Sequence, residues 1–324
     1  MTHTGSPPVA FSIAEVPEGQ RVALWENHNA EALIGLRCKT LDGTTLDAME
    51  INLQLEHLHL ARVRGTSHVV ERDRALIRRR PAEAIALYFS LAGEAFFYHD
   101  DGIRTVKPGQ LLLCDADRPF MRGFSHGLEE LVLRIPRDVF AQVTGIEQIP
   151  EPVVVDFATG TGAHAHALAR SVGRATRTDV KGTANEPALL QLVGAVASAA
   201  LGGRRDDLPA AHRAAARVFV EAHLHEPDLS ATRIAAAIGI SPRHLSRVFA
   251  DDGTSVPRYV LGRRLDAARA LLQRPETAAL TVADVARRCG FTSAAHFSNA
   301  FTTRFGERPS DVRRDAVAAR AARA

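Results

Sequence analysis

The spacing of apolar residues divides the chain into a strand-rich part and a helix-rich part. From about residue 36 to 136, short runs of β-branched and aromatic residues alternate with turn signals such as Asp42-Gly43 and Pro108-Gly109. Such runs are typical of an antiparallel sandwich or barrel. The expected strands lie within 58–63, 84–91, 94–99, 111–114 and 130–135, and a hairpin is expected at Asp100-Asp101-Gly102.

Helical spacing dominates the rest of the chain. Residues 20–34, 163–175 and 186–201 favour helices, and from Pro209 onward only helices with short turns are expected. Residues 1–10 are expected to be disordered, and Gly202–Asp207 is expected to be a linker. The predicted fold class is therefore α+β: an antiparallel barrel or jelly roll with flanking helices, followed by an all-α domain.

Two stretches of the helical part share one plan of helix, glycine turn and second helix. In 229–251, Gly239 suits a turn of positive φ, and Ser241-Pro242 suits the start of the second helix. The inward side chains of that helix are Leu245, Val248 and Phe249. Its outward residues suit a DNA major groove and are the candidate DNA-binding residues of the first helix-turn-helix unit: Ser241, Arg243, His244, Ser246 and Arg247.

The plan recurs in 281–305. Thr281 with Asp284 forms a capping-box pattern, Gly290 takes the turn and Ser293 suits the next helix start. Phe297, Phe301 and Phe305 recur at core spacing. The candidate DNA-binding residues of this second unit are Ser293, Ala295, His296, Asn299, Thr302 and Arg304. One long helix, 256–273, joins the two units, so two reading helices on one face would enter major grooves one turn, about 34 Å, apart.

The stretch from Ala211 to about Arg314 resembles the DNA-binding domain of the AraC/XylS family of transcription regulators. The residues that carry the resemblance are Ile234-Ala235, Gly239, 241–249, Arg264-Leu265, Ala268-Arg269, Leu271-Leu272, 282–286, 289–291, 296–298, Phe301, Phe305-Gly306 and Pro309-Ser310. The resemblance implies binding to double-stranded promoter or operator DNA, with RNA polymerase as a further partner and with activation or repression both open. It implies base contacts at Arg243, Ser246 and Arg247, and at Ala295, His296 and Asn299. Ala294 and Ala295 replace the long polar residues of family members, so weaker reading is expected there.

Residues from about Phe11 to Phe140 resemble the cupin-like sensing domain of the same family. The match rests on stretches such as 60–63, 88–93, 106–113 and 131–136. It implies a small-molecule effector, whose identity and binding residues the sequence leaves unknown, and dimer contacts. The alternative is a cupin-type metal-dependent enzyme fused to a DNA-binding domain. His57 and His59 could form half of a metal site, but 111–114 supplies no histidine, so we expect no metal, no cofactor and no catalytic residues.

Charge supports a polyanion partner for one half of the chain. Residues 209–324 hold 18 Arg and no Lys against 11 acidic residues, so 18 − 11 = +7. The rest has 40 − 18 = 22 basic and 37 − 11 = 26 acidic residues, a balance of −4. Without an apolar run of about 18 residues or a secretory signal, a cytoplasmic protein with no membrane partner is expected.

Two other interpretations are weaker. Val153–Gly162 resembles the strand and glycine turn of a nucleotide-binding unit, but too few residues follow for the βα repeats of that fold, so a loop before a helix is expected. A DNA-repair fusion would need a reactive cysteine, and Cys38, Cys114 and Cys289 lie far apart with no CxxC pair.

The expected domain organisation follows from these patterns. A sensing and dimerisation domain spans 1–180, a dimer helix and linker 181–208, the DNA-binding domain 209–316 and a tail 317–324. The dimer helix is proposed because an apolar stripe runs along 186–201, at Leu189, Leu190, Val193, Val196 and Ala197. Packing of this stripe within its own domain is the alternative.

Overall fold

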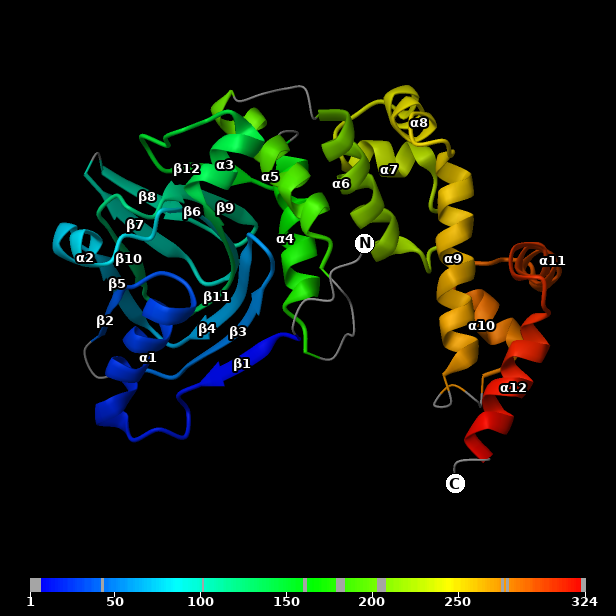
Figure 1. The fold of residues 1–324 in the computed structure, drawn as a ribbon, viewed down its shortest axis with the longest axis horizontal. Helices are drawn as coiled ribbons and strands as arrows, with labels where there is room; N and C mark the ends of the chain where they lie inside the picture. Colours follow the sequence, from blue (N-terminus) through cyan, green and yellow to red (C-terminus); the bar gives the residue numbers. More distant parts are fainter. Residues whose placement is uncertain are drawn as a thin grey trace. The chain divides into compact units, whose positions relative to one another are not determined.

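The computed structural model describes residues 7–41, 44–100, 102–159, 162–178, 184–202, 208–274, 277 and 280–321. The chain forms two compact units, Met1–Ala215 and Ala216–Ala324 (Figure 1). All the strands that the structure describes lie in the first unit, and the described part of the second unit is helical. The predicted α+β fold class is therefore confirmed.

Two antiparallel sheets form the first unit. The larger sheet has the order β1-β3-β4-β11-β6-β9-β12, and the smaller has the order β2-β5-β10-β7-β8. The larger sheet consists of β1 (Val9–Ser12), β3 (Ala48–Gln54), β4 (His59–Gly65), β11 (Leu128–Pro136), β6 (Ala84–Ala92), β9 (Gln110–Asp115) and β12 (Val153–Asp156). The smaller consists of β2 (Arg37–Thr40), β5 (His68–Arg72), β10 (Phe120–Phe124), β7 (Ala95–His99) and β8 (Gly102–Val106). The sheets do not close into one barrel, so the arrangement is the jelly-roll form of the prediction.

Alternation along the strands gives the larger sheet two buried faces. One face packs on the smaller sheet, and Val63 and Tyr88 of the larger sheet share one hydrophobic core with Phe97 of the smaller. The opposite face carries a second set of buried side chains, including Leu60, Leu87, Phe89, Leu111 and Leu133. Helices α3 (Arg137–Thr144) and α4 (Ala163–Ala175) pack on that face, with α5 (Glu186–Leu201) against them (Figure 1). The remaining helices of this unit that the structure describes are α1 (Glu18–Ala32) and α2 (Arg74–Arg79).

Helix α5 is held in the first unit at its start and along its length. The Glu186 carboxylate accepts hydrogen bonds from the backbone N–H groups of Glu56, His57 and Leu58, at 3.0, 2.8 and 2.7 Å. Of the predicted dimer stripe, four residues are buried and one is half-buried: Leu189, Val193, Val196 and Ala197, and then Leu190. The helix contacts α3 and α4, so most of the stripe is already covered within the unit.

Three expectations about the ends and edges of elements were wrong. Val9 and Ala10 are not irregular, because they belong to β1, which pairs with β3. Residues 153–156 form β12, an edge strand that pairs with β9, and not a loop. Residues 317–321 continue α12 (Pro309–Ala321), so the predicted tail begins inside a helix.

Some other expectations concern residues outside those described. They are the turn at Asp42-Gly43, Asp101 of the predicted hairpin, Gly160-Thr161 and residues 203–207 of the linker. The hairpin itself is confirmed by its strands, because Tyr98 pairs with Ile103 and His99 with Gly102 across β7 and β8.

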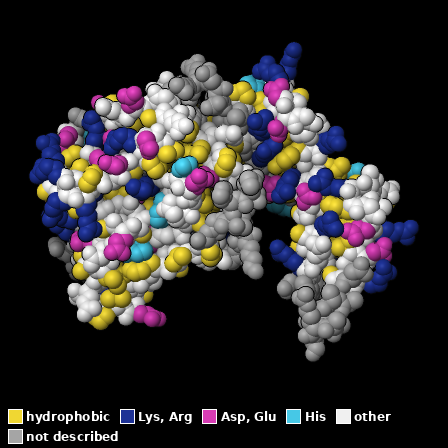
Figure 2. Space-filling view, viewed as in Figure 1, with side chains coloured by type: hydrophobic (Ala, Val, Ile, Leu, Met, Phe, Trp, Pro, Cys, Tyr) yellow, Lys and Arg dark blue, Asp and Glu magenta, His cyan; other side chains and the backbone are white. Residues whose placement is uncertain are grey.

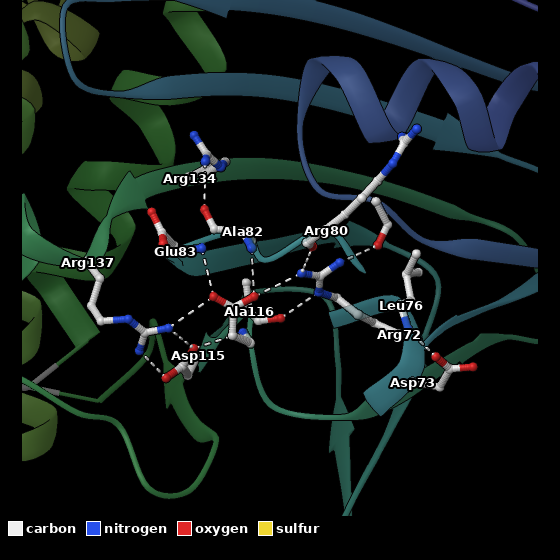
Figure 3. A network of polar contacts seen from close by, with 12 residues as sticks. Arg72, Asp73, Leu76, Arg80, Ala82, Glu83, Asp115, Ala116, Arg134 and Arg137 are labelled. Atoms are coloured by element: carbon white, nitrogen blue, oxygen red, sulfur yellow. Dashed lines mark hydrogen bonds and ion pairs between the residues drawn. The ribbon is translucent and has the colours of Figure 1, made fainter. Parts of the chain in front are cut away.

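A buried arginine joins the loops at one end of the two sheets (Figure 3). The Arg72 side chain is fully buried. It donates to the carbonyl oxygens of Ala116, Gly35 and Arg80 at 2.7, 2.8 and 2.8 Å, and to Asp117 at 2.9 Å. Asp117 also accepts from the backbone N–H groups of residues 82 and 83. Because the donors and acceptors satisfy one another, we assign this network a structural role.

The second unit is built around one long helix, α9 (Val256–Gln273), as the sequence predicts. The described helices before it are α6 (Leu208–His223), which crosses the boundary between the units, α7 (Ala231–Ala237) and α8 (Pro242–Ala250). Those after it are α10 (Val282–Arg288), α11 (Ala294–Phe305) and α12. In Figure 1, α8 and α11 are both seen nearly end on beside α9. In the described part of the chain, no helix has the length and apolar character needed to cross a membrane.

Candidate DNA-binding surface

The first helix-turn-helix unit forms as its sequence predicts. Gly239 ends α7 with φ +72°, which permits the tight turn into α8. The Ser241 hydroxyl then accepts a hydrogen bond from the backbone N–H of His244 at 3.1 Å, and Pro242 occupies the first turn. The cap and the turn fix the direction in which α8 leaves α7.

Helix α8 separates buried and exposed residues cleanly. Its inward side chains, Leu245, Val248 and Phe249, are buried against the rest of the unit. Arg243, Ser246 and Arg247 are exposed, and His244 is half-buried. The Ser246 hydroxyl donates to the Pro242 carbonyl at 2.9 Å, so its oxygen remains available only as an acceptor.

The second helix-turn-helix unit repeats this construction. Thr281 and Asp284 form the predicted capping box, with hydrogen bonds of 3.1 and 2.9 Å. Gly290 has φ +79° in the turn, and the Ser293 hydroxyl accepts from the N–H of His296 at 3.2 Å. Phe297 and Phe301 are fully buried, with ring centroids 5.5 Å apart. Their burial anchors α11 on α9 and α10.

The outward face of α11 is exposed and offers small and polar side chains. Ala295, His296, Asn299 and Thr302 are all exposed, as predicted. Arg304, the sixth predicted residue of this unit, lies differently. Its guanidinium binds the Asp266 carboxylate on α9, with the shortest distance 2.8 Å. As the structure stands, this side chain links α11 to α9.

Arginines of the second unit fall into two groups. Several pair with carboxylates: Arg217 with Asp252, Arg233 with Glu226, Arg263 with Glu221, Arg269 with Glu307, and Arg304 with Asp266. A second group is exposed and has no ion-pair partner among the described residues: Arg243, Arg247, Arg258, Arg274, Arg288 and Arg308. Arg258, in the first turn of α9, was not predicted from sequence. Dark-blue side chains protrude from the second unit near the place of α8 (Figure 2).

The first unit encloses a cavity between its sheets and α1. About 440 Å³ of space, openings included, is lined mainly by apolar side chains together with Arg122, Glu130 and His68. Arg122 donates to both Glu130 oxygens at 3.1 and 2.6 Å. Sequence alternation could not show which strand faces point inward.

The described residues hold no cluster of three or more side chains suited to bind a metal. His57 lies near Glu56 at the surface. His59 is buried and shares a 2.8 Å hydrogen bond with Asn52. The two histidines therefore lie in different surroundings and do not form half of a metal site.

The three cysteines are buried, free thiols. Burial raises the pKa of Cys38 and Cys114 to about 12 and that of Cys289 to about 11. Since the thiolate is the nucleophile, these thiols are poorly suited to alkyl transfer. Two capped reading helices in one helical unit, joined to a jelly roll with an internal cavity, define a two-domain DNA-binding transcription regulator.

Family models match both units. A model described as Helix-turn-helix domain matches residues 234–315, and a model described as AraC-binding-like domain matches residues 25–202, more than half of the chain. The chain belongs to the AraC family of transcription regulators, which bind DNA. The family favours the regulator over the enzyme alternative.

Two of three similar proteins match most of the chain, and the third matches about a third of it. Transcriptional activator NphR of Rhodococcus sp is 28% identical over 275 residues, which cover 80% of this chain and 78% of that protein. Transcriptional activator RhrA of Rhizobium meliloti (strain 1021) is 38% identical over 113 residues, 35% of this chain and 36% of that protein. The crystal structure of the AraC-like transcriptional activator CuxR matches with a TM-score of 0.50 at 18% identity, over 80% of this chain and 93% of that one. This last likeness shows the shared fold.

Proposed function

We propose that the chain binds promoter DNA through α8 and α11 and activates transcription in response to a small molecule in the first unit. The observation that carries the DNA-binding proposal is the pair of exposed arginines on the outward face of the capped helix α8. Arg243 and Arg247 stand exposed on α8 with no carboxylate partner among the described residues, while several arginines elsewhere in the unit bind carboxylates. A guanidinium without a carboxylate partner keeps its donors for guanine or phosphate.

The two helices are proposed to contribute unequally. Helix α8 offers two arginines, each able to form paired hydrogen bonds with guanine. Helix α11 offers His296, Asn299 and Thr302, with only methyl contact from Ala295. Asn299 suits adenine, and the Ala295 methyl suits thymine. We propose that α8 supplies most of the sequence discrimination and α11 a weaker second half.

Activation is proposed because the similar proteins NphR, RhrA and CuxR are all described as transcriptional activators. Such a protein would act in the cytoplasm, where it would contact RNA polymerase at the promoter. Purified polymerase and a bound promoter would test this step, since added chain should raise the transcript yield. A lower yield would assign repression instead.

Arg247→Ala tests the reading role of α8. We predict a loss of about 1–3 kcal/mol in binding to the selected site, with relaxed preference at one base pair. Gel-shift titrations on the selected site and on random DNA would measure both effects. Arg314→Ala, which removes an exposed arginine that pairs with Asp311 on α12, is the matched control. Equal losses on selected and random DNA would reassign Arg247 to phosphate contact.

A further inference from the structure

A carboxyl group inside the first unit has no hydrogen-bond partner. The Glu50 side chain on β3 is fully buried, and neither of its oxygens accepts a hydrogen bond from a described residue. Buried polar atoms nearly always have partners, and a buried unpaired carboxylate carries a large free-energy cost. This pair of acceptors is therefore a feature that the fold alone does not explain.

The Asn52 amide lies near Glu50 and opposes the rise in the pKa of Glu50, but it forms no hydrogen bond of normal geometry with either carboxylate oxygen. His59 Nε2 lies 2.8 Å from Asn52 Oδ1, and Asn52 Nδ2 lies 3.2 Å from His28 Nε2. An amide oxygen only accepts and an amide nitrogen only donates, so the chain of hydrogen bonds runs from His59 through Asn52 to His28. His28 Nε2, 3.6 Å from the Glu50 carboxylate, is thus an acceptor. Burial lowers the pKa of both histidines and keeps them neutral.

Arg122, the buried cation in the cavity lining, already binds a carboxylate. Arg122 forms two hydrogen bonds with Glu130, and its guanidinium lies 3.9 Å from the centroid of the Tyr88 ring. His68 shares a 2.7 Å hydrogen bond with the Thr66 carbonyl through Nδ1, which leaves Nε2 as an acceptor. Apart from Arg122 Nε, a buried donor with no partner, the unused hydrogen-bonding capacity of these groups is that of acceptors.

Glu50 belongs to a row of paired residues across the larger sheet, and this row borders the cavity. It is paired with Val63 on β4, and Val63 is paired with Glu130 on β11. Val63 and Glu130 both line the cavity, and neighbouring strands lie about 5 Å apart. Trp25 of α1 and Phe124 supply aromatic walls. Glu50 itself does not line the cavity, but its pairing with Val63 directs its side chain to the same face of the sheet.

We propose that the effector is a small amphipathic amine, whose ammonium group binds the Glu50 carboxylate while its apolar part packs against Trp25 and Phe124. This inference rests on the proposed control by an effector in the first unit. An ammonium group supplies both the donors and the positive charge that Glu50 lacks, and it has no acceptor to oppose the neighbouring histidines. A carboxylate ligand would meet Glu50 and an Arg122 that is already paired.

Matched ligands on the full-length chain test the charge class. Benzylamine, benzyl alcohol and benzoate share one ring, and butylamine, butanol and butyrate share one chain. By titration calorimetry at pH 7.5 we expect an amine to bind most tightly in at least one set. Glu50→Gln should weaken that amine at least tenfold and change the alcohol little. Glu94→Gln removes an exposed carboxylate and is the control. Three results would overturn the proposal. The carboxylates could bind more tightly than the amines, or neither amine could bind. The third is that Glu50→Gln binds the amine with an affinity within twofold of wild type.

A second measurement needs no variant. Burial raises the pKa of Glu50 to about 7, against the opposing effect of the Asn52 amide, so at pH 6 the group is mostly protonated. Binding of an ammonium ion favours the carboxylate, and the proton passes to the buffer. Calorimetry in two buffers with different ionisation enthalpies should therefore show release of most of one proton per amine and none per alcohol. Amine binding without proton release would contradict contact with Glu50.

The test of the amine assignment can be separated from the test of the proposed function. Gel shifts on the same preparations report DNA binding with and without ligand. If amines bind at Glu50 but leave both DNA binding and transcription unchanged, the ligand class stands and effector control fails. If a carboxylate or an alcohol changes DNA binding while Glu50→Gln has no effect, effector control stands and the amine assignment fails.

Discussion

Single residues in this chain acquire their roles from neighbours that the sequence does not reveal. Arg247 and Arg304 both lie on helices predicted to face DNA. Arg247 has no ion-pair partner among the described side chains, whereas Arg304 binds Asp266, 38 residues away. The helical period placed both residues correctly on their helices. Only the packing of α11 on α9 distinguishes a side chain that is free to meet DNA from one that links two helices.

Glu50→Gln should change the dependence of stability on pH. The pKa of Glu50 is raised to about 7 in the folded chain against a usual 4.5, so the folded state holds a proton that the unfolded state releases between these values. The contribution of Glu50 to stability is therefore full below pH 4.5 and falls as pH rises to about 7. We predict that Glu50→Gln matches wild type at pH 5 and exceeds it at pH 8, by at most about 3 kcal/mol.

Urea unfolding of both proteins at several pH values measures this difference. The buried histidines, whose lowered pKa values reduce stability as pH falls, are present in both proteins and cancel in the comparison. A constant offset between the two proteins from pH 5 to 8 would show that Glu50 is charged throughout.

Gly290 should be far less tolerant of substitution than Gly253. Both have positive φ, +79° and +70°. A Cβ on Gly290 would lie 2.4 Å from the Leu224 carbonyl oxygen and 2.9 Å from Arg264 Nε, whereas Gly253 faces open space. We predict a loss of about 1 kcal/mol for Gly253→Ala and about 3 kcal/mol for Gly290→Ala, measured by unfolding. Similar losses at both sites would mean that the turn moves to accept the methyl group.

At the scale of helices and strands, local signals predicted the helical unit well. Caps and glycine turns act within four residues, so Ser241, Thr281, Ser293 and the bounds of α9 could be predicted from the sequence. Strand β1 was missed because an edge strand of four residues gains its stability from its partner β3. The inward position of Glu50 was missed for the same reason. Alternation defines two faces of a strand, but only the second sheet determines which face is buried.

Helix α5 remains the predicted dimer element, and its packing refines the test. Val193 is 1% exposed, so Val193→Glu would bury a charge and should unfold the first unit. Leu190 is half-buried, and Leu190→Glu should leave the fold intact. Light scattering at micromolar concentration should then show a dimer for wild type and a monomer for Leu190→Glu. A folded, dimeric Leu190→Glu would place the dimer surface elsewhere on the first unit.

At the scale of the whole molecule, the boundary between the acidic and basic parts of the chain lies near the boundary between the two compact units. The basic excess of residues 209–324 belongs mostly to the helical unit, and α8 presents two exposed arginines with no ion-pair partner among the described residues. The cavity belongs to the other unit. Effector binding is thus assigned to the first unit and DNA binding to the second. Because each unit has its own core, substitutions in one core need not disturb the other.

Selection of bound sequences from a random DNA library by the full-length chain tests the central claim most directly. Two reading helices in one unit predict a motif of two blocks whose centres lie about 10–10.5 base pairs apart, one helical turn. The block read by α8 should be the more strongly specified and rich in guanine, and Arg247→Ala should weaken that block alone. A motif with one block, or enrichment that does not depend on sequence, would contradict the claim that α8 and α11 read DNA together.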